Sequence, residues 1–257
     1  MSLLQMSLSG GIFIMAIVFI RSVTINRLPK KTFLVLWELV LLRLLIPVSV
    51  PSRFSLYTIL PKALQTKTPA LMPVISHESF ETAPKDLAFH PAQPVPIWII
   101  IWCIGMIFCF VFFAILYLRC RIEFLTSCPI QDTYAIQWLR EHPLKRPLAI
   151  RESDRISTPL TYGVLRPVIL MPHQTDWKDI SRLQYILLHE FVHIRRFDTV
   201  VKLIMTGALC LHWFNPMVWA MYILMNRDLE LSCDESVIQH FGESSKPVYA
   251  RILIDMK

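Results

Sequence analysis

Three long apolar blocks constrain what this chain can fold into more than any other feature of its sequence. They cover residues 1–20, 32–50 and 97–118, and only Glu38 and Arg43 place charges inside them. Each block is close to the roughly 20 residues that a helix needs to cross a lipid bilayer. Hydrophobic residues make up 54% of the chain and charged residues 18%, which is too apolar for an ordinary soluble domain. The sequence therefore predicts a polytopic membrane protein with three transmembrane helices.

The distribution of charge predicts how these spans are oriented. The first block has neither a basic leader nor an obvious cleavage site, so we interpret it as a span of the mature protein. Basic residues crowd the link between spans one and two and follow span three directly: Arg21, Arg27, Lys30, Lys31, Arg119 and Arg121. Under the positive-inside rule both segments are cytoplasmic, which leaves the N-terminus and the loop 51–96 outside the cell. Topology thus explains the net charge of +7, and we expect no direct binding of nucleic acid.

Residues 119–257 predict a cytoplasmic, mainly helical domain with a small β-sheet. Short strands are expected, between turn-forming residues, at 147–153, 157–164 and 166–172. The fold class is therefore α+β, attached to the transmembrane helices. We interpret 162–172 as the region that pairs with an extended peptide, as sheet edges commonly do. The six cysteines form no CxxC pair, and we interpret them as small apolar side chains.

The stretch LLHEFVHIRRFD contains an H-E-x-x-H pattern. His189 and His193 are four residues apart, so a helix places them on one face, where both ring nitrogens can bind the same metal. Glu190 lies next to that face and can act as a general base. The pattern predicts a zinc site, and the alternative is an amphipathic helix end that carries two surface histidines.

A catalytic zinc site normally has a third protein ligand. Asp198 would be turned away from the metal face of one continuous helix, so we expect it to pair with Arg195 or Arg196 or to cap a helix. Glu230 is the better candidate, because Asp234 follows it by one helical turn and can orient a ligand histidine. The alternative for Glu230 is a solvated acid on a helix surface. We therefore predict Glu230 as the third ligand.

The segment between Lys202 and Arg227 has 24 residues without a formal charge, and hydropathy alone would make it a fourth span. Such a span would separate Glu230 from the two histidines. Asn215 is a good N-cap and Pro216 a good first helical residue, so we predict two helices, about 199–214 and 216–240, that fold back on each other. The apolar tip of this membrane-associated pair is expected at the membrane interface or against the spans.

The motifs STPLTYGVLRPVILMP, HEFVHIRRFD, LHWFNPMVW and LELSCDE together resemble the BlaR/MecR-type membrane metallopeptidases, a gluzincin-type family of bacterial sensor-transducers and antirepressors. The resemblance implies one Zn²⁺ per chain, held by His189, His193 and Glu230. It implies Glu190 as the general base and Asp234 as the partner of a ligand histidine, in the first instance His189. It also implies a multi-pass protein of the bacterial plasma membrane with a cytoplasmic peptidase domain.

In better-known members a fourth span and an external sensor follow, and activation leads to cleavage of a cytoplasmic DNA-binding repressor. The sequence ends at Lys257, before such a span, so sensing of β-lactams is not carried over. The expected partners are the lipid bilayer and a protein substrate, either a repressor or the chain itself, and a homodimer is compatible with this reading. The expected activity is that of a zinc metalloendopeptidase in transmembrane signalling.

Three alternatives stay open at this point. The first is a non-proteolytic transducer with a structural zinc site, although such a site needs no general base. The second is an intramembrane protease, although Arg182, Arg195 and Arg196 flank the motif closely. The third is a housekeeping or CAAX-type membrane protease, from which only the family resemblance separates this chain.

Overall fold

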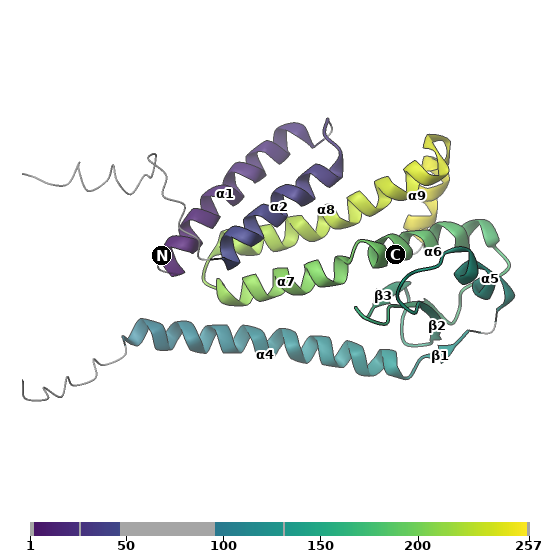
Figure 1. Cartoon of the computed structure of the whole chain (residues 1–257), viewed down its shortest axis with the longest axis horizontal. Coiled ribbons are helices and arrows are strands. Elements are labelled where there is room, and N and C mark those ends of the chain that lie inside the picture. The colour runs from purple at the N-terminus through teal and green to yellow at the C-terminus, as the bar shows by residue number, and fades with distance from the viewer. Residues whose placement is uncertain (1–2, 26, 47–95, 131, 256–257) are drawn as a thin grey trace, which may run out of the picture.

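The computed structural model describes residues 3–25, 27–46, 96–130 and 132–255. All but the last residue of the loop expected at 51–96 lies outside the described residues, as do residues 47–50 of the second apolar block. The remainder forms a bundle of long helices at one end and a small α/β part at the other (Figure 1).

Two helices are long and apolar enough to cross a membrane, over Leu3–Thr24 and Ile97–Ile122. They correspond to α1 (Leu3–Thr24) and to most of α4 (Ile97–Leu125). The second block forms α2 (Lys30–Leu45), which at 16 residues is shorter than the predicted span and pairs with α1 in a helical hairpin. α2 packs mainly on α1 and on α8 (Pro216–Phe241).

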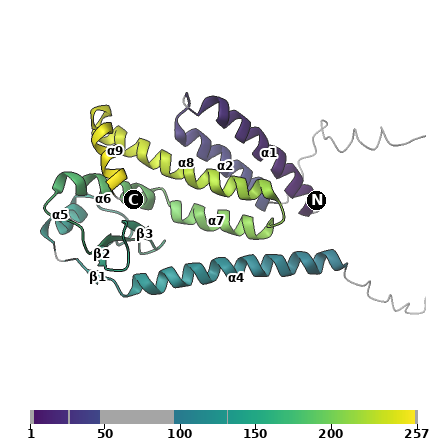
Figure 2. The ribbon, with the colours of Figure 1, turned by 180° about the vertical axis from the view of Figure 1, so that it is seen from behind.

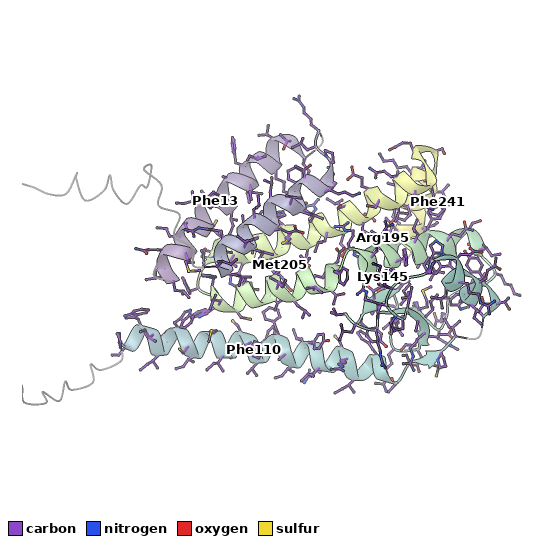
Figure 3. The ribbon with its side chains drawn as sticks, viewed as in Figure 1. Phe13, Phe110, Lys145, Arg195, Met205 and Phe241 are labelled. Carbon is purple, nitrogen blue, oxygen red and sulfur yellow. The ribbon has the colours of Figure 1, made fainter. Side chains whose placement is uncertain are left out.

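The apolar side chains of the bundle divide into a buried core and an exposed surface. Met205 lies in the core, whereas Phe13 on α1 and Phe110 on α4 are more than half exposed (Figure 3). The core is built from four helices, and its fully buried members include Ile14, Phe33, Trp37, Leu44, Met205, Leu209, Val218, Met221 and Met225. The exposed apolar surface of α1 and α4 is what lipid-facing helices present.

The uncharged segment forms two helices with a tight turn, as the sequence predicts. α7 runs over Asp198–Leu211 and α8 begins at Pro216, after Asn215, whose side chain accepts a hydrogen bond from the backbone N–H of Met217 (2.9 Å). Gly242 ends α8 with φ +90°, a conformation that suits glycine. The pair folds back on itself beside α4, and both views show this arrangement (Figures 1 and 2).

The tip of this helical pair packs on both candidate spans. The Asn215 amide donates to the backbone oxygen of Ser7 on α1 (3.0 Å), and Trp102 on α4 donates its indole N–H to the backbone oxygen of Leu211 (3.0 Å). A Cβ added to Gly105 on α4 would lie 2.3 Å from the ring of Trp213, so the two surfaces meet closely there. Of the two expected positions for the tip, the structure therefore shows the one against the spans.

A buried ion pair joins α1, α2 and α8. Arg21 donates from Nε and from Nη2 to the carboxylate of Asp228 (3.0 and 2.8 Å), and the indole N–H of Trp37 donates to the same carboxylate (2.9 Å). Asp228 and Trp37 are fully buried and Arg21 is 9% exposed. Arg21 therefore also stabilises helix packing, a role that the sequence analysis did not predict.

The α/β part contains a four-stranded sheet of order β1-β2-β4-β3, in which β2 and β4 are parallel and the outer pairings are antiparallel. The three predicted strands are present with shorter bounds, and β1 is an addition. The elements are β1 (Cys128–Pro129), α5 (Thr133–Glu141), β2 (Ala149–Ser153), β3 (Leu160–Tyr162), β4 (Val168–Pro172), α6 (Ile180–Arg195), the short 3-10 helix η1 (Glu243–Ser245) and α9 (Lys246–Asp255).

The free edge of the sheet differs from the predicted one. β4 is paired on both sides, so most of the region 162–172 is not available to a peptide. β1 and β3 are the two edge strands, and β3 is the one that lies beside α6. The order of these strands in the sheet is set by the hairpin between β3 and β4, which the sequence pattern of the strands does not show. Gly163, with φ +84°, lies in that hairpin, and a Cβ there would approach the backbone oxygen of Arg166 to 2.5 Å.

Candidate metal centre

The two histidines of the motif lie one turn apart on α6. The side chain of Asp179 caps the start of α6 by accepting a hydrogen bond from the backbone N–H of Arg182 (3.1 Å). The apolar face of α6 packs into the core of the α/β part. The Nε2 atoms of His189 and His193 face each other at 3.2 Å. α6 thus presents two ring nitrogens to one point.

α8 brings Glu230 to the same point. Its Oε2 atom lies 3.3 Å from Nε2 of His193 and 3.7 Å from Nε2 of His189. Its other oxygen, Oε1, accepts from Nζ of Lys202 on α7 (3.1 Å). The structure therefore brings the three predicted ligands together, which the folded-back helical pair makes geometrically feasible.

The opposite nitrogen of each imidazole is held by a buried acceptor. His193 donates Nδ1–H to Oδ2 of Asp198 (2.7 Å). His189 donates Nδ1–H to the hydroxyl of Tyr249 (2.7 Å), which in turn donates to Oδ1 of Asp234 (2.7 Å). Oδ1 of Asp234 is itself 3.3 Å from Nδ1 of His189. Asp234 thus lies beside His189, as predicted. The shorter contacts run through the hydroxyl of Tyr249, which lies between the two side chains.

The position of Asp198 corrects the prediction from a continuous helix. α6 ends at Arg195, and the chain turns at Phe197, which has φ 59° and ψ 33°. Among the described residues Phe197 alone, glycines apart, has positive φ, and no glycine or proline in the sequence signals the turn. Asp198 is therefore directed back towards His193, while its Oδ1 lies 3.5 Å from Nε of Arg196, a pairing that the sequence did predict.

Arg146 stabilises this turn. Its guanidinium lies 3.9 Å from the centre of the Phe197 ring. It also donates to the backbone oxygens of Ile194 (2.7 Å) and Val164 (2.5 Å), which ties the end of α6 to the β3–β4 hairpin. The left-handed conformation of a bulky residue is unfavourable on its own. The contacts with Arg146 help to offset that cost.

The donor set fits a metal ion. Because each Nδ1–H is already donated, a neutral imidazole at either position presents the lone pair of Nε2, and Oε2 of Glu230 adds a further lone pair. Three acceptors within 3.2–3.7 Å of one another repel unless a proton or a metal ion lies between them. Around a tetrahedral metal with bonds of about 2.0–2.1 Å, neighbouring donor atoms lie roughly 3.3–3.4 Å apart. The separations of 3.2 and 3.3 Å are close to that spacing, and the third, of 3.7 Å, is somewhat longer.

The electrostatics of the cluster also favour positive charge. Burial alone would lower the pKa of His193, but the Asp198 carboxylate and Glu230 outweigh it and raise the pKa to about 11. The pKa of His189 is likewise raised, because its contacts with Asp234 and Glu230 overcome the effect of burial. Burial would raise the pKa of Glu230, yet its contacts with the two imidazoles hold that pKa well below its usual value. A metal that binds here must displace protons from the imidazoles.

Glu190 lies beside the donors in a cleft of about 520 Å³. It is 8% exposed, and burial raises the pKa of its carboxyl. The cleft is lined by the edge strand, by the three predicted ligands and by parts of α4, α7 and α9: Tyr117, Thr158, Pro159, Leu160, Thr161, His189, Glu190, His193, Asp198, Thr199, Lys202, Leu203, Thr206, Glu230 and Leu253. A larger hollow of about 670 Å³ elsewhere on the α/β part contains none of the metal-binding candidates.

Cys233 also belongs to this cluster, although the sequence reading treated it as an apolar side chain. Its Sγ and one ring nitrogen each of His189 and His193 all lie within 4.8 Å of one another. Burial would raise the pKa of the thiol, but the two imidazoles lower it below its usual value. His212, by contrast, is buried at the far end of α7 with Nε2 3.1 Å from the backbone oxygen of Leu44, and His240 is exposed. Neither lines the cleft.

Replacing Asp198 by asparagine should weaken zinc binding roughly 10- to 100-fold, the usual effect of removing the partner of a ligand histidine. The amide keeps the shape of the side chain but loses the charge that orients His193. Competition with a chromophoric chelator would measure the affinity. Asp176→Asn is the matched control, because Asp176 is exposed and caps only a turn at Lys178. Equal affinity in Asp198→Asn and the control would show that Asp198 does not support the site.

Comparison with known proteins gives a consistent result. The family described as BlaR1 peptidase M56 matches residues 1–257. The methicillin resistance mecR1 protein of Staphylococcus aureus (strain Mu50 / ATCC 700699) is 23% identical over 253 residues, which are 93% of this chain and 43% of that protein. The regulatory protein BlaR1 of Bacillus licheniformis is 28% identical over 105 residues, 41% of this chain and 18% of that protein.

The chain therefore spans less than half the length of these relatives. The family match, however, covers all of it, and it confirms the resemblance carried by the zinc motif, the folded-back helices and the LELSCDE segment. A metallopeptidase family implies a bound metal, which the donor set described above fits. This chain belongs to the BlaR1 peptidase M56 family.

Proposed function

We propose that this chain is the zinc endopeptidase part of a membrane-embedded bacterial regulator. The convergence of His189, His193 and Glu230 beside the buried Glu190 carries the proposal. Those three side chains would hold the zinc ion, since their donor atoms lie 3.2–3.7 Å apart. A metallopeptidase needs a metal site and a general base in one cleft, and these four side chains would supply both.

When bound, zinc would polarise the scissile carbonyl and lower the pKa of water. Glu190 would remove a proton from the attacking water and return it to the leaving amine. Burial raises the pKa of the Glu190 carboxyl above its ordinary value, although the two imidazoles oppose that effect. Asp198 and the Tyr249–Asp234 pair would keep both Nε2 atoms directed at the metal.

The substrate would bind as an extended peptide along β3. Leu160 and Thr161 of this edge strand line the same cleft as Glu190, and the outer side of β3 carries no partner strand among the described residues. Backbone pairing with an edge strand holds a peptide largely independently of its sequence. Tyr117 of α4 lines the cleft as well, so a candidate span would contribute to the substrate site.

The cleft would face the cytoplasm of the bacterial cell, with α1 and α4 in the plasma membrane and the N-terminus outside. The positive-inside argument rests on Arg21, Arg27, Lys30 and Lys31 in and beside the first link and on Arg119 and Arg121 at the end of α4. These segments lie at the end of the bundle that adjoins the α/β part (Figure 1). One membrane side would then hold both the basic segments and the cleft.

The names of the relatives, a regulatory protein and a methicillin resistance protein, favour a signalling substrate over a housekeeping one. We propose that the chain cleaves a cytoplasmic DNA-binding repressor, itself, or both. A repressor gene beside the gene for this chain would support this substrate. A housekeeping or CAAX-type protease would act on many unrelated proteins or on prenylated tails instead.

Removal of the metal should abolish cleavage, and zinc should restore it. The purified chain in detergent would be incubated with a candidate repressor and with a fluorogenic peptide library. Ortho-phenanthroline should stop hydrolysis because it removes zinc, whereas its non-chelating meta isomer should not. Hydrolysis that persists in a chain shown to be free of metal would exclude the proposed chemistry.

A further inference from the structure

A buried thiol adjoins the proposed zinc ligands, and the proposed mechanism makes no use of it. Cys233 follows Glu230 by three residues on α8 and is fully buried. Its Sγ, one nitrogen of His189 and one nitrogen of His193 lie mutually within 4.8 Å. The thiol donates to the backbone oxygen of His189 (3.2 Å), so it is directed towards α6 rather than into the core of the bundle.

The chemistry of these donors suits zinc as well as the predicted set does. Zinc binds thiolate sulfur and imidazole nitrogen readily, and sites that combine cysteine and histidine are common. Glu230 and Cys233 reach the two imidazoles from the same helix, one from the cleft and one from a buried position. The space between the two imidazoles is thus flanked by two further side chains that can bind a metal.

We propose that Cys233 is a fourth protein ligand, which closes the coordination of the metal held by His189, His193 and Glu230. The inference rests on the proposed function. On binding, Sγ releases its proton and gives up the hydrogen bond to the oxygen of His189. Four protein ligands are typical of structural zinc sites, whereas catalytic sites keep one position for water. The closed site is thus a latent form, and hydrolysis requires Cys233 to leave the metal.

Cobalt provides the test, because Co²⁺ replaces Zn²⁺ and a bound thiolate gives it an intense charge-transfer absorption in the near ultraviolet. The full chain in detergent would be loaded with cobalt as the wild type, Cys233→Ala, Cys233→Ser and Cys210→Ala. Cys210 is the matched control, since it is buried on α7 outside the cluster. Circular dichroism would verify that each variant is folded. Two Cys233 variants are made so that the test still stands if one of them does not fold.

The wild type and Cys210→Ala should show the thiolate band. Both Cys233 variants should lose it while still binding one cobalt, with affinity for zinc lower by about tenfold or more, since loss of a ligand should cost at least as much as loss of a ligand's partner. Acetohydroxamate, which needs an open position on the metal, should bind more tightly to Cys233→Ala than to the wild type.

A wild type that binds one cobalt without the thiolate band overturns the assignment of Cys233 and leaves the proposed peptidase intact. A band that survives in both Cys233 variants also overturns it, because another thiol must then be the source. A chain that binds no cobalt or zinc at all contradicts the metal site itself, and the proposed function falls with it.

Discussion

Glu190→Gln should reduce hydrolysis by a factor of at least about 10²–10⁴, the usual contribution of a general base. Glutamine has nearly the same shape and can still accept a hydrogen bond, but it cannot take a proton from water. Glu190 is 8% exposed and lines the cleft beside His189 and His193 without being among the donors that face each other. The variant should therefore keep its metal and its fold while it loses activity.

The measurement is kcat/KM on a peptide that the wild type cleaves, together with zinc per chain. Glu141→Gln is a suitable control, because Glu141 is an exposed residue of α5, outside the cleft, whose side chain accepts a hydrogen bond from Gln137. An active Glu190→Gln enzyme would require another base. A variant without zinc would show instead that Glu190 supports the site.

Asp228→Ala should destabilise the protein by about 3–5 kcal/mol, the usual cost of removing one partner from a buried ion pair. It leaves the guanidinium of Arg21 and the indole N–H of Trp37 buried without their shared acceptor. α8 also carries Glu230 two residues further on, so loosening of α8 should weaken zinc binding as well. Asp228 does not line the cleft, so this loss of zinc affinity would be an indirect effect of helix packing.

The double variant Arg21→Met/Asp228→Leu tests whether the loss of stability comes from leaving a buried charge without its partner. Removing both charges leaves no unpaired ion, and well-packed apolar pairs often equal or exceed buried ion pairs in stability. It should recover most of the free energy of unfolding that Asp228→Ala loses, as measured by denaturant titration in detergent micelles. Asp228→Ala with the stability of the wild type would mean that the contact between α1, α2 and α8 contributes little.

The sequence predicted which side chains lie together where the signal was local or was tied to a geometric constraint. The i, i+4 spacing of His189 and His193 needs only a helix. Glu230 was chosen because Asp234 follows it by one turn. The folded-back helices followed from a contradiction, because a fourth span would have separated Glu230 from the histidines and Asn215–Pro216 offered a turn. The structure places that turn where the capping residues predicted it. The strands were also found, since turn residues separate them.

The parts that the sequence did not predict depend on tertiary contacts. Asp198 reaches His193 only because the chain turns at Phe197, and the stabilising contact comes from Arg146, about fifty residues earlier in the sequence. Arg21 was counted as a topological charge, and its buried partner Asp228 lies 207 residues away. Such pairings leave no local pattern to detect.

Two further residues of the cluster had weak or misleading signals. Tyr249 belongs to an amphipathic run that predicts a helix but not a contact with His189. Cys233 is a single cysteine in a chain without any CxxC pair, and a buried cysteine is usually a small apolar residue. Only the packing of α8 against α6 places its sulfur near two imidazoles.

The most direct test of the proposed site is the zinc content of defined variants after gel filtration. The Cys233→Ala background is used, so that only His189, His193 and Glu230 are left to hold the metal. This background and its Glu190→Gln derivative should each retain close to one zinc per chain. Added His189→Ala or Glu230→Gln should remove it. If Glu230→Gln in this background kept its zinc as tightly as the parent, the third ligand would lie elsewhere and the proposed site would be wrong.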